Sequence, residues 1–144
     1  MKTVTFCGHR DVDTAEIIEE KLYTEIEKLI QQGASEFLLG GYGRFDSLCA
    51  KTVRSLKEKY PHITLVLVLA YMNKDFDKDL YDSSEYPSLE MVPKRFAILK
   101  RNEYMIKKAD AVIAYVKRSW GGAAKTLEFA QKKRKYIIRI DEMI

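Results

Sequence analysis

Apolar residues in this chain of 144 residues fall into short continuous runs, separated by longer segments in which they recur periodically. Short apolar runs bounded by turn residues are typical of strands that are buried on both faces of a parallel sheet. Five such runs predict strands: Thr3–Cys7, Glu36–Leu39, Ile63–Ala70, Ala111–Val116 and Tyr136–Ile140.

The segments between these runs repeat their apolar residues every three or four positions, which predicts helices. The first predicted helix begins at a capping box formed by Asp13 and Glu16 and ends at Gly33. Further helices are predicted over residues 46–60, 94–108 and 122–135. Strands alternating with helices predict one α/β domain over residues 1–144, a Rossmann-like three-layer sandwich with a parallel sheet of about five strands.

Residues 71–93 fit neither pattern. They carry six carboxylates against Lys74 and Lys78, and they hold two of the three prolines. A connector of about 20 residues is long for a compact domain, and loops of this kind often act as lids or binding loops. We therefore predict an irregular acidic loop that acts as a partial lid.

The composition is that of an ordinary globular domain, with 47% hydrophobic and 32% charged residues. The net charge is only +4, but residues 94–135 carry thirteen Lys and Arg against three acids. A basic region of this kind serves nucleic acid or a polyanionic small ligand, or it is simply a solvated helix face. No base-stacking motif accompanies it, so nucleic acid is the secondary candidate partner.

Cys7 and Cys49 are too few for a disulfide framework and lack metal-ligand spacing, so we interpret both as small core residues. The residues predict no metal site and no cofactor. No apolar run is long enough to span a bilayer, and the start of the chain does not look like a signal peptide. We therefore expect a cytoplasmic protein without a membrane partner.

Two glycine-rich stretches, Gly40–Asp46 and Gly121–Thr126, each follow a predicted strand and open a helical segment. This arrangement lets backbone N–H groups approach a phosphate while the helix dipole favours its charge. The first stretch lacks the third glycine of the dinucleotide fingerprint and follows the second strand, which disfavours a standard NAD dehydrogenase. Two such loops at one sheet edge predict a nucleotide-like ligand, with close approach at Gly41, Gly43, Gly121, Gly122 and Ala123.

Polar residues follow the first strand and open the second helix at the same edge. In the turn Gly8-His9-Arg10, the planar guanidinium of Arg10 suits phosphate or carboxylate. His9 either donates to a phosphate or is a structural turn residue. Asp46 either caps its helix or accepts hydrogen bonds from ribose hydroxyls.

The predicted helix over residues 94–108 directs Asn102 inward, next to Arg101. Because a buried amide must be hydrogen-bonded, Asn102 either pins a glycine loop or contacts a ligand. Arg101 is a candidate for ligand or carboxylate recognition, and the Thr126 hydroxyl offers a further donor. Trp120 either stacks on a base or packs beside the entrance.

Together these residues resemble the SLOG superfamily of Rossmann-like proteins, named for the DNA-processing protein A domain and the lonely-guy phosphoribohydrolases. The resemblance is to a small bacterial and phage branch and covers almost the whole chain. It implies a Rossmann-like fold, a nucleotide-derived ligand held between the two glycine loops, and a homo-oligomer. The motifs that carry it are Phe6–Asp11, Gly40–Asp46, Tyr86-Pro87 with Glu90, Pro93–Ile98, Arg101-Asn102, Ala109-Asp110 and Gly121–Ala123.

The lonely-guy enzymes cleave the N-glycosidic bond of nucleoside monophosphates with an arginine and a glutamate. Arg101 and Glu128 fall in register with that pair, so the resemblance implies that they are catalytic if this protein is a hydrolase. The phosphate loop departs from the pattern, since Asn102 replaces a lysine and Ala124 replaces a glycine.

The leading hypothesis is therefore a binding domain for a nucleotide or an NAD-derived small molecule. Its polar contacts are Arg10, Asp46, Arg101 and Thr126, beside the amides of the two loops. The alternative is a phosphoribohydrolase that releases base and ribose phosphate.

Overall fold

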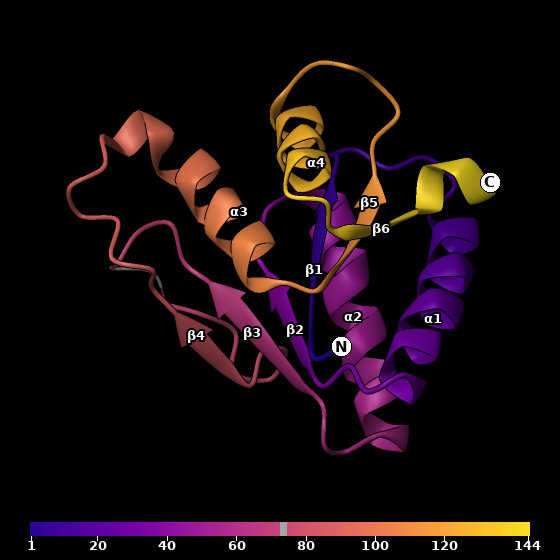
Figure 1. Ribbon diagram of the computed structural model, residues 1–144. Coiled ribbons are helices and arrows are strands. Elements are labelled where there is room, and N and C mark those ends of the chain that lie inside the picture. Colours follow the sequence, from indigo (N-terminus) through magenta and orange to yellow (C-terminus); the bar gives the residue numbers. More distant parts are fainter. Residues whose placement is uncertain (73–74) are drawn as a thin grey trace.

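The computed structural model describes residues 1–72 and 75–144. Within these residues, six parallel strands form one sheet with the order β4-β3-β2-β1-β5-β6 (Figure 1). The strands are β1 (Thr3–Gly8), β2 (Glu36–Leu39), β3 (Thr64–Val68), β4 (Ser83–Glu85), β5 (Ala111–Tyr115) and β6 (Tyr136–Arg139). The prediction of a Rossmann-like α/β sandwich is confirmed, with one strand more than the five apolar runs indicated.

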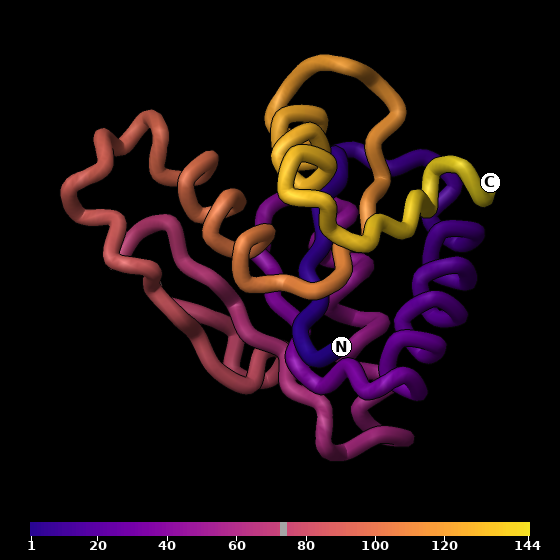
Figure 2. The backbone as a smooth tube through the Cα atoms, viewed as in Figure 1, coloured from indigo at the N-terminus to yellow at the C-terminus, as the bar shows by residue number. Residues whose placement is uncertain are grey.

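Four α-helices cover the described part of the sheet, two on each face (Figures 1 and 2). They are α1 (Ala15–Gln31), α2 (Gly43–Lys59), α3 (Ala97–Lys108) and α4 (Gly122–Lys132), with short 3₁₀ turns at Lys94–Phe96 and Ile140–Met143. Alternate residues of β1 point to opposite faces: Val4 packs in the core beneath α1 and α2, and Cys7 packs in the core beneath α4. The two cysteines are buried and free, as predicted.

Strand β4 lies inside the segment predicted as irregular. Its sequence, Ser83-Ser84-Glu85, has no apolar run to reveal it, and only its pairing with β3 at the sheet edge makes it a strand. Asp82, just before β4, accepts a hydrogen bond from the Leu65 N–H at 2.7 Å and fixes the start of this pairing. Residues 73–74, within the predicted lid, lie outside the described residues.

The starts of three helices differ from the prediction, and α3 begins at Ala97 because residues 94–96 form a 3₁₀ turn. Thr14 precedes α1 in a left-handed conformation, with φ 52°, and no side-chain hydrogen bond caps this end within the described chain. The predicted capping box of Asp13 and Glu16 is therefore wrong, because that backbone geometry does not bring the box together. Helix α2 begins at Gly43, so Asp46 lies within its first turn.

The topology opens a crevice between β1 and β5. Helix α1 follows β1 to one face of the sheet, whereas α4 follows β5 to the other face (Figure 1). At such a switch point the loops at the carboxyl ends of the two strands diverge, and ligands of this fold class bind there. Of the described helices, none is both long and apolar enough to cross a membrane.

Candidate functional site

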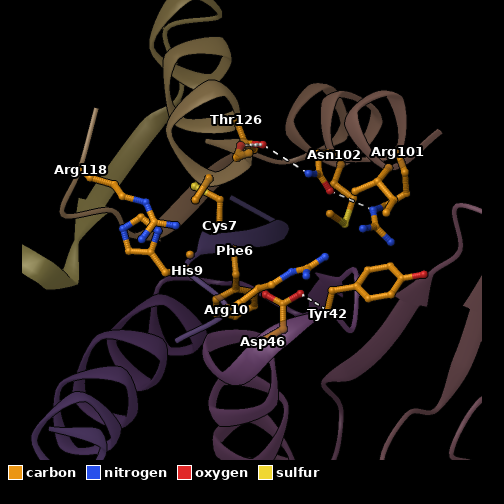
Figure 3. Close-up of a pocket in the computed structure, with 15 residues that line it drawn as sticks. Phe6, Cys7, His9, Arg10, Tyr42, Asp46, Arg101, Asn102, Arg118 and Thr126 are labelled. Carbon is orange, nitrogen blue, oxygen red and sulfur yellow. Dashed lines mark hydrogen bonds between the residues drawn. The ribbon is translucent and has the colours of Figure 1, made fainter. Parts of the chain in front are cut away.

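A cavity of about 330 Å³ lies at this switch point (Figure 3). It is enclosed by the loops that follow β1, β2 and β5, together with α3 and the first turn of α4. The cavity brings together most residues that the sequence singled out: Gly8, His9, Arg10, Asp46, Arg101, Asn102, Gly122, Ala123 and Thr126. Gly41, Gly43 and Gly121 do not line it, and Glu128 lines a different cavity.

Gly43 allows two segments of the chain to approach each other closely. Its φ is +87°, and a Cβ at this position would lie 2.7 Å from the Arg10 Cα. The Arg44 N–H donates to the Arg10 carbonyl at 2.8 Å, which joins the loop after β1 to the first turn of α2. Gly43 thus acts on the cavity indirectly, by holding Arg10 beside Asp46 (Figure 3).

Arg101 is the most deeply buried charged residue at the cavity, with 2% of its surface exposed. Its Nη1 donates to the carbonyl of Gly40 at 3.1 Å and to that of Val68 at 3.0 Å, which are the ends of β2 and β3. A Cβ on Gly40 would lie 2.6 Å from the Arg101 Cζ, so this glycine leaves the room that the guanidinium needs. Burial lowers the pKa of Arg101, and the charge of Asp46 opposes that shift.

A hydrogen-bonded chain runs from Arg101 to the start of α4. The Arg101 Nε donates to the Asn102 Oδ1 at 2.9 Å, and the Asn102 Nδ2 donates to the Thr126 Oγ1 at 3.3 Å. The Thr126 hydroxyl in turn donates to the Gly122 carbonyl at 2.9 Å. Asn102 therefore pins the second glycine loop, and the Thr126 proton is already committed within the helix.

Asp46 is half-buried and faces the cavity (Figure 3). Its Oδ2 accepts the Tyr42 N–H at 3.1 Å, so it does support the start of α2. Burial raises the pKa of Asp46 to about 6, against the opposing effects of the Tyr42 N–H and the Arg101 charge. Among the described residues that line the cavity, Asp46 is the one carboxylate.

His9 presents a buried polar atom that has no partner. The residue is 5% exposed, and its Nε2 accepts the Lys117 N–H at 2.8 Å. Burial, assisted by the nearby Arg118 charge, lowers the pKa of His9, so the ring is neutral and Nδ1 carries its proton. Within the described residues this Nδ1–H donates to no acceptor, although buried donors are rarely left so.

The N-terminus of α4 points at the same cavity. Gly122 and Ala123 line the cavity, no side-chain hydrogen bond caps the helix in the described structure, and its first turn holds no acid. The first N–H groups of a helix have no partner within the helix and carry its positive dipole end. Arg10 and Arg118 line the same cavity, so together with these N–H groups they make it complementary to an anion.

The structure separates the two residues that the hydrolase alternative requires. Glu128 lies on α4 beyond the first turn, and its side chain is exposed. It lines a second cavity of about 300 Å³, whose walls also include Lys117, Arg118 and Arg139. Arg101 lines the first cavity instead. The two residues therefore do not face one cavity.

Sequence reasoning missed several residues of the cavity wall. Arg118 could have been predicted from its position, because it follows β5 at the carboxyl edge of the sheet just as Arg10 follows β1. The Tyr42 ring lies against the Arg101 guanidinium, 5.3 Å from centroid to Cζ, and no spacing rule indicates this pairing. The remaining missed residues are apolar or weakly polar: Phe6, Cys7, Ile98 and Met105.

The fold and the cavity at its switch point define a Rossmann-like α/β domain. The chain belongs to the YspA SLOG family, whose model matches residues 6–141. The resemblance to the SLOG superfamily is therefore confirmed over nearly the whole chain.

A sequence relative and a solved structure are similar to this chain over most of its length. The prophage-derived protein YoqJ of Bacillus subtilis (strain 168) is 27% identical over 138 residues, which cover 80% of this chain and 81% of that protein. The molybdenum cofactor carrier protein of Chlamydomonas reinhardtii superposes with a TM-score of 0.64 at 18% identity, over 96% of this chain and 75% of that one.

DNA processing protein A of Helicobacter pylori, whose structure concerns single-stranded DNA binding, superposes with a TM-score of 0.67 at 18% identity. The match covers 95% of this chain but only 64% of that one, less than two thirds of its length. At these identities the likeness to solved structures shows the fold alone.

Proposed function

We propose that this protein binds a phosphate-bearing small molecule, a nucleotide or an NAD-derived compound, in the cavity between β1 and β5. The convergence of the uncapped α4 N-terminus with Arg10 and Arg118 on one cavity carries the proposal. Helix amides and guanidinium groups are both donors that match phosphate oxygens. The unpartnered Nδ1–H of His9 adds a buried donor that such an anion would satisfy.

The other side of the cavity supports a sugar next to the phosphate. Asp46 lies across from the start of α4 (Figure 3), and its carboxylate is an acceptor suited to ribose hydroxyls. The volume of about 330 Å³ is near the lower end of the range of about 300–1,000 Å³ that small-molecule sites span. A ligand of mononucleotide size suits this volume better than a whole dinucleotide.

A substitution at Gly122 tests the site. No described atom lies within 4 Å of a Cβ built at this position, so Gly122→Val is compatible with the fold. Its branched side chain would occupy the place proposed for the phosphate. We expect the thermal shift given by nucleoside monophosphates, NAD, ADP-ribose and cyclic ADP-ribose isomers to disappear in Gly122→Val, with little change in the unliganded melting temperature. Unchanged affinity in this variant would overturn the assignment.

Turnover is the second candidate, favoured by a cavity carboxylate whose pKa lies near 6. Hydrolysis of an N-glycosidic bond requires a carboxylate beside the sugar to activate water or to protonate the leaving base. Chromatography of the same mixtures reports any released base. Base release lost in Asp46→Asn and kept in Glu128→Gln would assign Asp46 the chemistry, whereas the reverse would assign it to Glu128. Stabilisation without product leaves binding as the function.

A further inference from the structure

Trp120 is the only tryptophan of the chain and lies in the loop between β5 and α4. It is 66% exposed, so its indole fills no core. The Arg118 guanidinium covers one face of the ring, with Cζ 4.2 Å from the ring centroid. Arg118 also lines the cavity (Figure 3), so its guanidinium connects the cavity to the ring of Trp120 on the loop.

Trp120 belongs to none of the hydrophobic clusters that the described residues form. Large aromatic side chains contribute most to recognition where a flat apolar face and a polar edge are both accessible. The loop also places Trp120 two residues before Gly122, the first residue of α4. Trp120 is therefore close in sequence to the proposed phosphate position, and a base that extends out of the cavity along this loop would meet the ring.

We propose that Trp120 is the stacking platform for the aromatic base of the ligand, and that Arg118 occupies this platform only until the ligand arrives. This inference rests on the proposed function. The anionic group of the ligand draws the Arg118 guanidinium toward the cavity, and the base takes its place on the indole. A base stacked on an aromatic ring is a stronger interaction than a solvent-exposed cation–π contact, so the exchange is favourable.

The single indole makes the test direct, because all tryptophan fluorescence of the protein comes from Trp120. The probes are the monophosphates of adenosine, guanosine, cytidine and uridine, together with base-free ribose 5-phosphate and inorganic phosphate. We expect nucleoside monophosphates to quench the emission saturably. Ribose 5-phosphate should bind, as judged by thermal shift, without comparable quenching.

Substitutions at Trp120 distinguish the loss of base stacking from a general effect on the fold. Trp120→Ala should weaken nucleoside monophosphate binding about 5- to 100-fold and leave ribose 5-phosphate binding unchanged, whereas Trp120→Phe should retain most of the affinity. Tyr136→Ala removes another exposed aromatic residue, on β6, and should change neither affinity.

The outcomes distinguish the two proposals. If ribose 5-phosphate and the nucleoside monophosphates bind equally well, or if Trp120→Ala weakens both to the same extent, the stacking role is wrong and the phosphate site stands. If none of these probes binds, and NAD, ADP-ribose and cyclic ADP-ribose isomers give no thermal shift either, the proposed function fails and the stacking role fails with it.

Discussion

The Asp46 carboxylate shows how one residue of the cavity affects stability. Its pKa is raised from 3.8 to about 6, mainly by burial. A carboxyl group whose pKa is higher in the folded state destabilises the fold as it ionises. The penalty, of the order of 3 kcal/mol, is fully present above about pH 6 and disappears as the pH falls toward 3.8.

Asp46→Asn should therefore raise the free energy of unfolding at neutral pH, and the gain should shrink toward about pH 4. The asparagine oxygen still accepts the Tyr42 N–H, so the start of α2 is preserved. Urea denaturation of both proteins at the two pH values measures this difference. A gain of equal size at both values would show that ionisation of Asp46 is not its cause.

The burial of Arg101 shows what periodicity does not reveal about a single residue. The helical pattern directs Asn102 inward, and the sequence indicates Arg101 as a ligand candidate beside it without predicting that it is buried. In the structure Arg101 is the more buried of the two, because the carbonyls of Gly40 and Val68 accept hydrogen bonds from its guanidinium. These acceptors belong to the ends of two other strands, and local spacing carries no information about them.

At the scale of the element, the start of α4 has competing roles in stability and in binding. Helices gain stability from an acidic residue in the first turn, yet α4 has none there and no side-chain hydrogen bond at its cap. An acid at this place would repel the anion that we propose to bind. The bare helix start is therefore consistent with a binding role.

Ala123→Asp should separate these two effects. A carboxylate in the first turn should stabilise the helix by about 0.3–1 kcal/mol, and it should weaken nucleotide binding by tenfold or more through charge repulsion. Ala123→Asn matches the aspartate in size but carries no charge, and it is the control. Melting temperature and calorimetric affinity are the two readouts. Equal losses of affinity in the two variants would indicate a steric effect and contradict an anion site at this helix.

Elements differed in how well the sequence predicted them. The buried strands have strong patterns because burial on both faces gives continuous apolar runs, and the four long helices have them because burial on one face repeats apolar residues every three or four positions. Strand β4 has no such pattern, since it is three residues long and defined by pairing with β3. The sheet edge that holds the cavity could be predicted from the topology, because the loops after the strands of a parallel sheet all lie at one end.

At the scale of the whole molecule, the cavity and the most basic region lie at opposite ends of the sheet. The cavity is at the carboxyl ends of the strands, whereas α3 and α4 end next to the amino ends of β5 and β6. There Lys107 and Lys133 both approach the Phe129 ring, with Nζ 5.9 and 5.4 Å from its centroid. Within residues 1–72 and 75–144 neither lysine forms an ion pair, so two like charges stay close together.

Self-association, which the SLOG resemblance implies, stays a prediction that light scattering tests.

This separation lets polynucleotide binding be tested apart from the cavity. Unpaired lysines are the kind of group that contacts backbone phosphates, and each phosphate neutralised steepens the salt dependence of binding. If the protein binds single-stranded oligonucleotides through this region, Lys107→Ala with Lys133→Ala should lower the affinity and reduce the slope of log K against log salt by about 1.4. The same double variant should keep its full thermal shift with nucleoside monophosphates, because the cavity is untouched. A slope that does not change while Gly122→Val abolishes oligonucleotide binding would place the polynucleotide in the cavity instead.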